Sequence, residues 1–273
     1  MTKNENNSEF MKKLAPALIM IVVAFLIIVV LALSGVGQKK EKEDTVSISG
    51  IWISIIENMD SDDGSAGLNS VRTYSKYFTW TADGENGYYA TKKIQLQNVE
   101  AVGSTSAYVR TAIRPTLSVT VSDENGEDSE KILDEDSLGE YGLASLGELT
   151  DLVFTDEDGN EVDSWRNAAA YRMGDITFEL ADGWSGCWVY NEEDGYFYYK
   201  AIIDPGMATA SLLLEKVRIS AETYEIMQNY GIELQVEVTA DAVSTASGVL
   251  EETWGTAADL GITVRSDGTL GVY

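Results

Sequence analysis

The stretch from Ile176 to Ser244 constrains the fold most strongly, because short β-prone runs alternate there with turn-forming residues. Two aromatic-rich runs, 188–190 and 196–199, flank a short acidic connection that ends in Gly195. Such a connection between two β-prone runs predicts a hairpin. Proline and glycine at 205–206 predict a turn after it, since proline fixes φ and glycine permits the conformation that follows.

The second half of this stretch continues the same alternation. A β-rich run covers 209–220, a short helical insert covers 221–230, and a segment that alternates apolar and polar residues begins at Ile232. Alternation with a period of two predicts a strand with one buried face. Strands and turns rich in glycine, aspartate and asparagine dominate the whole chain, so we expect an all-β, antiparallel sandwich with short helical inserts.

The order of these elements resembles the C-terminal half of the TasA/camelysin family. These are exported proteins of Gram-positive bacteria, processed by a dedicated (SipW-type) signal peptidase, and they include biofilm-matrix fibre subunits. The matching segments are Trp188–Tyr190, Gly195–Tyr199, Pro205–Gly206 and Ile232–Ala242, with an upstream strand pair at 93–99 and 107–115. The resemblance implies a jelly-roll-like sandwich and polymerisation by strand exchange. The N-terminus lacks the family's usual Ala-Tyr-Phe-Thr start.

The N-terminal segment predicts export. Leu14–Leu33 is an almost unbroken apolar run of a length that crosses a bilayer as a single hydrophobic helix. Its length favours a retained anchor, whereas the small residues before Gly35 favour cleavage of a signal peptide, so both alternatives stay open for residues 1–34. Either one places the rest of the chain outside the cell or at its surface. Residues 35–45 form a charged linker.

The most β-prone segment follows this linker, at 46–56. Its apolar residues share one face if Gly50 forms a β-bulge. As the first strand after a linker, it is also the candidate for addition to the sheet edge of another copy. The candidate assembly residues are Val46, Ile48, Ile51, Ile53 and Ile55.

Further elements complete the domain expected at 46–248. Strands are expected at 71–81, 90–99 and 107–121, with Pro115 placing the last of these at a sheet edge or a bend. A small hairpin is expected around the turn at 156–159, and a short helix within 133–150. Residues 249–273 are expected to form a C-terminal extension with a helix at 249–254 and a final hairpin around 266–268.

The composition argues against catalysis. The chain has no histidine and a single cysteine, Cys187, which removes histidine-activated nucleophiles and the common zinc sites. We therefore expect no enzyme, no catalytic or metal-binding residues and no cofactor. Acidic turns such as Asp156–Glu161 leave weak Ca²⁺ binding as an open alternative. The net charge of −26 opposes binding to nucleic acid and to anionic lipid headgroups.

These observations favour an exported structural protein of the cell surface or extracellular matrix, a fibre subunit that associates with itself or with other surface proteins. The alternative is a membrane-anchored monomeric adhesin or ligand-binding module, held in the membrane by residues 14–33 if these are uncleaved. A camelysin-like metalloprotease is a remote third alternative, because its zinc site would have to be built without histidine.

Overall fold

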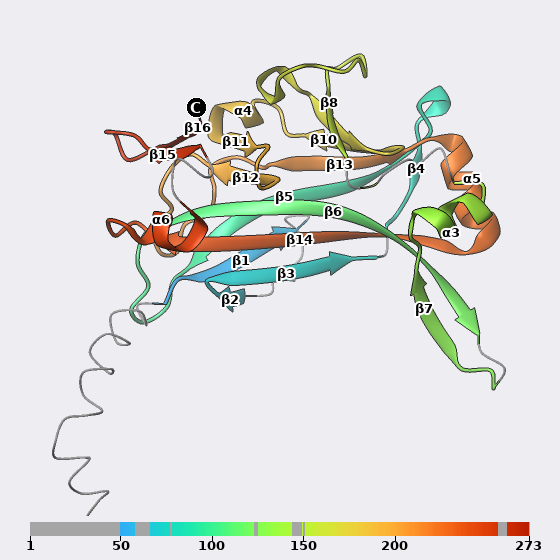
Figure 1. The fold of residues 1–273 in the computed structure, drawn as a ribbon, viewed down its shortest axis with the longest axis horizontal. Coiled ribbons are helices and arrows are strands. Elements are labelled where there is room, and N and C mark those ends of the chain that lie inside the picture. The colour runs from blue at the N-terminus through green and yellow to red at the C-terminus, as the bar shows by residue number, and fades with distance from the viewer. Residues whose placement is uncertain are drawn as a thin grey trace, which may run out of the picture. The chain divides into compact units, whose positions relative to one another are not determined.

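The computed structural model describes residues 50–57, 66–76, 78–122, 125–143, 149, 151–255 and 261–272. They form a body that begins at Gly50 and consists mostly of antiparallel strands (Figure 1). The hydrophobic helix expected at Leu14–Leu33 lies outside the described residues. Within the described ranges, no helix combines the length and the apolar character needed to cross a membrane.

Two large sheets make up this body. Sheet A contains, in spatial order, β2 (Ala66–Leu68), β1 (Trp52–Glu57), β5 (Tyr88–Val99), β13 (Leu214–Ile219), β10 (Ile176–Leu180), β9 (Ala170–Met173) and β8 (Leu152–Thr155), with β4 (Thr81–Ala82) also paired to β5. Sheet B contains β11 (Trp188–Asn191), β12 (Tyr196–Tyr199), β6 (Ala107–Ser122), β14 (Ile232–Ser244) and β3 (Ser70–Ser75), with β7 (Asp128–Ile132) paired to the end of β6. A small third sheet joins β15 (Ile262–Val264) to β16 (Leu270–Val272).

One core lies between the two large sheets. Along β14, apolar side chains at alternate positions from Ile232 are buried, whereas the intervening residues are more exposed. The ring of Tyr171 in sheet A stacks on Phe178 at 4.8 Å and lies 5.6 Å from Phe197 in sheet B. Because side chains of both sheets meet in one apolar cluster, the body is a β-sandwich.

Short helices lie between the strands, and those within 133–150, at 221–230 and at 249–254 are the ones that the sequence predicts. The short helices are α3 (Glu135–Glu140), α4 (Trp184–Cys187), α5 (Ala221–Tyr230) and α6 (Val249–Trp254), with 3₁₀ turns η1 (Gly84–Asn86) and η3 (Trp165–Asn167). The hydroxyl of Ser220 accepts a hydrogen bond from the Thr223 N–H at the start of α5, and Gly231 ends the helix in the left-handed conformation. These two caps end the helix on either side, and its bounds match the helical insert predicted at 221–230.

Other predictions need correction. The single strand expected at 71–81 is divided between β3 in sheet B and β4 in sheet A. Just before it, where the sequence predicts no strand, residues 66–68 form the short strand β2. Pro115 lies inside sheet B, where β6 runs between neighbours on both sides, and not at an edge strand. It is tolerated there because its register partner is on β14 alone, while β12 and β7 pair with residues before and after it.

The C-terminal segment is part of the body. Leu250 and Trp254 of α6 are buried, as are Ile262 and Leu270 of the terminal hairpin, and all four belong to the common core. The helix and hairpin expected there are present, but they pack on the sandwich and do not form a separate extension.

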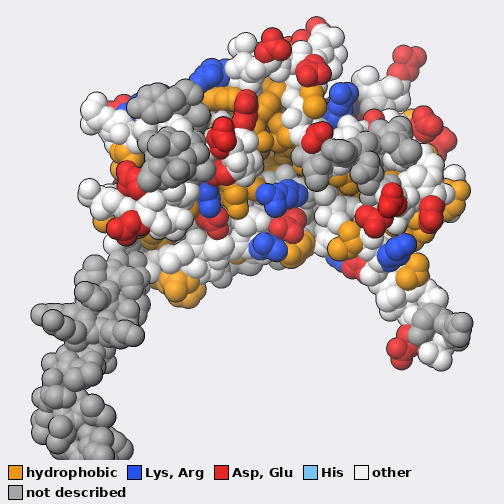
Figure 2. Space-filling model, viewed as in Figure 1, with side chains coloured by type: hydrophobic (Ala, Val, Ile, Leu, Met, Phe, Trp, Pro, Cys, Tyr) orange, Lys and Arg blue, Asp and Glu red, His pale blue; other side chains and the backbone are white. Residues whose placement is uncertain are grey.

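Acidic side chains are spread over the face of the molecule shown in Figure 2, and several basic side chains lie near its middle. This distribution agrees with the strongly negative net charge of the chain.

Candidate assembly site

Three of the five predicted assembly residues face the core of the sandwich. Ile53 and Ile55 belong to β1, and Ile51 directly precedes it. The side chains of Ile51, Ile53 and Ile55 are 3%, 0% and 0% exposed. Val46 and Ile48 lie outside the described residues, so the bulge at Gly50 that would align them with the isoleucines stays a prediction.

In this structure β1 is held by its own chain. It pairs with β5 over six residues, from Trp52 opposite Val99 to Glu57 opposite Ile94. On its other side it pairs with only three residues of β2. The inner face of β1 contacts β3 and β14 in the opposite sheet. The groove that receives the isoleucines is therefore formed by β5 of sheet A and by β3 and β14 of sheet B.

A buried ion pair closes the inner face of β1. Glu57 is the next inward-facing residue after Ile55, because side chains on one face of a strand recur every two residues. Its Oε2 atom lies 2.5 Å from Nζ of Lys92 on β5, and Lys92 is only 1% exposed. Since Glu57 is directly opposite Ile94, Lys92 is its diagonal neighbour on the adjacent strand.

Two hydroxyl groups of sheet B complete this polar cluster. Thr73 Oγ1 donates to Glu57 Oε1 at 2.7 Å, and Ser75 Oγ donates to Glu57 Oε2 at 2.6 Å. The ammonium group of Lys92 also contacts Ser75 Oγ. Both hydroxyls come from β3, so the cluster joins the two sheets at the end of β1.

Burial and pairing act in opposite directions on this cluster. Burial raises the pKa of Glu57, but attraction to Lys92 and hydrogen bonds from Lys92, Ser75 and Thr73 outweigh it, so the pKa falls below its usual 4.5. Burial lowers the pKa of Lys92, and the neighbouring carboxylate only partly offsets this effect. The two groups are therefore held as a desolvated ion pair.

Sequence reasoning missed both members of this pair. The signal was present, because Glu57 continues the period of two set by the isoleucines and Lys92 continues that of Ala90, Ile94 and Leu96. Charged residues in strands ordinarily face solvent, and this default hides an inward-facing pair.

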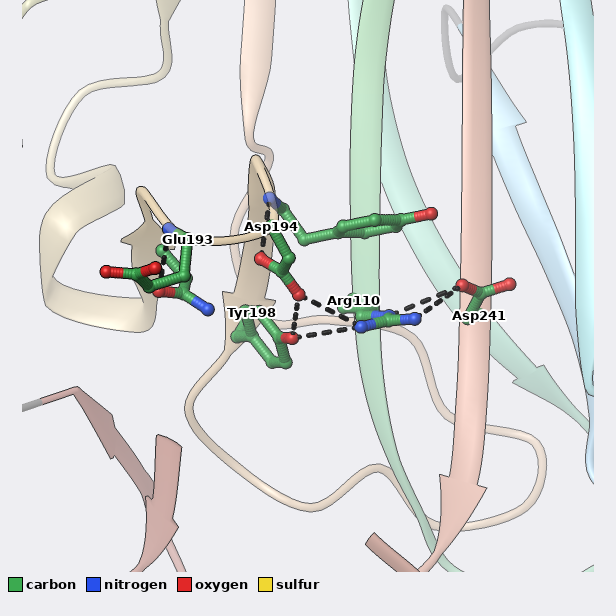
Figure 3. A network of polar contacts seen from close by, with 7 residues as sticks. Arg110, Glu193, Asp194, Tyr198 and Asp241 are labelled. Carbon is green, nitrogen blue, oxygen red and sulfur yellow. Dashed lines mark hydrogen bonds and ion pairs between the residues drawn. The ribbon is translucent and has the colours of Figure 1, made fainter. Parts of the chain in front are cut away.

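A second polar cluster lies on the outer face of sheet B (Figure 3). The guanidinium group of Arg110 on β6 contacts Oδ2 of Asp194 at 3.0 Å and Oδ2 of Asp241 at 3.3 Å. The Tyr198 hydroxyl donates to Asp194 at 2.5 Å and accepts from Arg110 at 3.0 Å. Two carboxylates thus neutralise one cation, and the cluster ties the hairpin turn and β12 to β6 and β14.

Aromatic rings from β12 and α6 lie close to the guanidinium group of Arg110. Its guanidinium carbon lies 4.1 Å from the ring centre of Tyr196 and 4.8 Å from that of Trp254 on α6. Burial raises the pKa of Tyr198, and its hydrogen bond to Asp194 raises it further. Burial alone would lower the pKa of Arg110, but the hydrogen bond with Tyr198 and the charge of Asp241 leave it raised.

The side chains of the aromatic hairpin pack mainly against other parts of the protein. Phe197 and Tyr199, on the inner face, are 1% and 5% exposed. Tyr198, on the other face, is also fully buried, because Trp254 packs against it with ring centres 5.4 Å apart. The protein itself therefore covers Phe197, Tyr198 and Tyr199, whereas Tyr196 stays partly exposed.

A cleft of about 490 Å³ opens beside the turn at 156–159 on sheet A. Its lining includes small side chains such as Ala170 and Thr177, and the charged pair Glu179 and Arg218, which form an ion pair. The carboxylate of Asp156 accepts hydrogen bonds from the backbone of its own turn. In the described part of the chain, no group of three or more cysteine, aspartate or glutamate side chains is arranged to hold a metal ion.

Comparisons with models of protein families, with curated proteins and with solved structures find no match for this chain.

Proposed function

We propose that this chain is an exported structural subunit of a fibre at the cell surface or in the extracellular matrix, and that β1 of one copy adds to the body of the next. One observation carries the proposal: β1 is the first strand in the described part of the body, two residues after its start at Gly50. A terminal strand can leave its groove and enter that of a neighbour without drawing the chain through the fold. The neighbour offers the same groove, so all native contacts are remade.

The energetics favour a filled groove. Burial of each isoleucine of β1 contributes about 1.5–3 kcal/mol, so a body without a strand in this position is strongly disfavoured. The same side chains are buried whether β1 docks in its own body or in another copy. The balance between monomer and fibre then depends on the protein concentration and on the conformational entropy that β1 gains or loses.

Export of the body is supported by the apolar run Leu14–Leu33 and by the resemblance to the TasA/camelysin family. We also propose that the sandwich is jelly-roll-like. This proposal is supported by the path of the chain, because the strands of six or more residues, β1, β3, β5, β6, β13 and β14, alternate between sheet A and sheet B in chain order.

A reversible covalent lock tests the assembly mechanism. Ile56 and Gln95 are directly opposite on β1 and β5, so Ile56→Cys and Gln95→Cys in a Cys187→Ser background place two thiols at disulfide distance. Oxidised at low concentration, this variant holds β1 in its own body. We expect monomers by size-exclusion chromatography and electron microscopy, and filaments after reduction.

The matched control places the same lock where no strand exchange is proposed. Val153 and Arg172 are opposite each other on β8 and β9, so Val153→Cys with Arg172→Cys should leave filament formation unchanged in both redox states. Filaments of the oxidised variant with cysteines at 56 and 95 would show that β1 does not move between copies.

The cleft beside the turn at 156–159 favours a second candidate function, a monomeric ligand-binding module at the cell surface. Its volume is in the range of small-molecule sites, and its walls carry both charges. This candidate requires that unlocked, fully processed protein stay monomeric at high concentration.

A further inference from the structure

The isoleucines alone do not define how β1 sits in its groove. Ile51, Ile53 and Ile55 are identical residues at alternate positions, so a shift of β1 by two residues along β5 would still place isoleucine side chains in the same apolar space. Such a shift keeps the same face inward, because the side-chain period of a strand is two. Aliphatic burial therefore selects the face of β1 but not its register.

Lys92 removes this ambiguity. The side chain of Lys92 is 1% exposed, and within the described residues its ammonium group forms an ion pair with Glu57. With β1 shifted by two residues, either Ile55 or Met59 would take the place of Glu57 beside Lys92. The ammonium group would then be buried without its counter-charge, which is strongly destabilising.

We propose that the groove beside β5 recognises one kind of strand, supplied by a second copy of this chain: aliphatic side chains at three successive inward positions and a carboxylate at the fourth. This inference rests on the proposed exchange of β1 between copies. Lys92 is the residue that selects the partner, and Glu57 is the residue that is selected. An inward-facing charge also disfavours the addition of purely apolar strands, a common protection of sheet edges.

Charge reversal in two separate chains tests this recognition. Glu57→Lys places two cations in one groove, and Lys92→Glu places two carboxylates there. Each variant alone is expected to dock β1 about 10²–10³-fold more weakly and to form few filaments, because breaking a buried ion pair is costly. In an equimolar mixture, each strand matches the groove of the other variant, so filaments should return.

A third chain that carries both reversals provides the matched control. Glu57→Lys with Lys92→Glu restores opposite charges within one sequence, so it should assemble with itself and not with the wild-type chain. To show that both variants enter the same filaments, each variant carries a different affinity tag. Filaments isolated through one tag should then also contain the other.

A neutral variant covers the case in which reversed charges prevent folding. Glu57→Gln with Lys92→Met removes both charges and should fold, as circular dichroism would show. Its strands are expected to dock in more than one register. Thiols at 56 and 95 cross-link copies in the native register, and thiols at 56 and 93 or at 56 and 97 report shifts of two residues, all in a Cys187→Ser background.

The results separate the inference from the proposed function. Wild-type levels of filaments from either single reversal would overturn the role of the Glu57–Lys92 pair while leaving strand exchange intact. Assembly of the doubly reversed chain with no recovery in the mixture would also overturn it, as would a single register in the neutral variant. Folded but persistently monomeric wild-type protein would instead refute the proposed function itself.

Discussion

At the scale of single residues, Arg110 is expected to be the most sensitive cation on the outer face of sheet B. Its side chain is 15% exposed and bridges Asp194 and Asp241. Arg110→Met leaves two partly buried carboxylates without their cation, so we expect a loss of about 2–4 kcal/mol in the free energy of unfolding. Urea denaturation monitored by tryptophan fluorescence measures this loss.

Arg72 provides the matched control on the same face. Its side chain is 56% exposed, and it forms an ion pair with Glu237 at 3.3 Å. Arg72→Met should barely shift the urea midpoint, since exposed ion pairs contribute little to stability. Equal effects of the two substitutions would contradict the role assigned to the Arg110 cluster.

Residue identity predicted the apolar half of the candidate site and not its polar half. The sequence placed Ile51, Ile53 and Ile55 on one face, and the structure buries all three together. Lys92 follows the inward period of Ala90, Ile94 and Leu96, but sequence alone does not show which residue of β1 lies beside it. That pairing depends on the register between β1 and β5, which is a property of the folded sheet.

At the scale of elements, the terminal hairpin tests whether residues after 248 belong to the body. Leu270 on β16 is fully buried, and its cross-strand partner Val264 on β15 is 44% exposed. Leu270→Ala should cost about 2–5 kcal/mol of stability through the lost burial and the cavity it leaves. Val264→Ala should have a much smaller effect, since its side chain is largely in water.

Thermal unfolding followed by circular dichroism distinguishes these two variants. A single transition shifted downward by Leu270→Ala indicates that the hairpin unfolds with the sandwich. A separate early transition, with the main one unchanged, would show instead that the C-terminal segment is an independent extension.

Local signals predicted some elements well. The glycine-ended turn at 191–195 identified the hairpin of β11 and β12, and the helical insert expected at 221–230 matches α5. The failures share a physical cause. Residues 71–75 and 81–82 form strands in two different sheets, and alternation shows which residues are buried without showing which sheet they join.

At the scale of the whole molecule, the net charge of −26 opposes the association of copies. Acidic side chains are spread widely over the surface in Figure 2, so the repulsion acts between whole bodies and not at a single contact. The Glu57–Lys92 pair, by contrast, is only 16% and 1% exposed, so added salt screens it much less. Assembly should therefore combine a salt-sensitive approach with a salt-insensitive recognition step.

Ionic strength and pH separate these two steps. The Debye length falls from about 10 Å at 0.1 M salt to about 3 Å at 1 M, so at pH 7 we expect filaments to form faster as sodium chloride rises.

Lowering the pH toward the isoelectric point near 4.1 also reduces the repulsion. The pKa of Glu57 is lowered below 4.5, so its contribution is complete above that value and is lost as the pH falls through the folded-state pKa. Assembly, followed by light scattering, should therefore accelerate from pH 7 to about pH 5 and decline in stronger acid, where Glu57 becomes protonated. The neutral variant Glu57→Gln with Lys92→Met has no such ion pair to lose and should lack this decline. A rate that is independent of salt, or an equal decline in both proteins, would contradict this account.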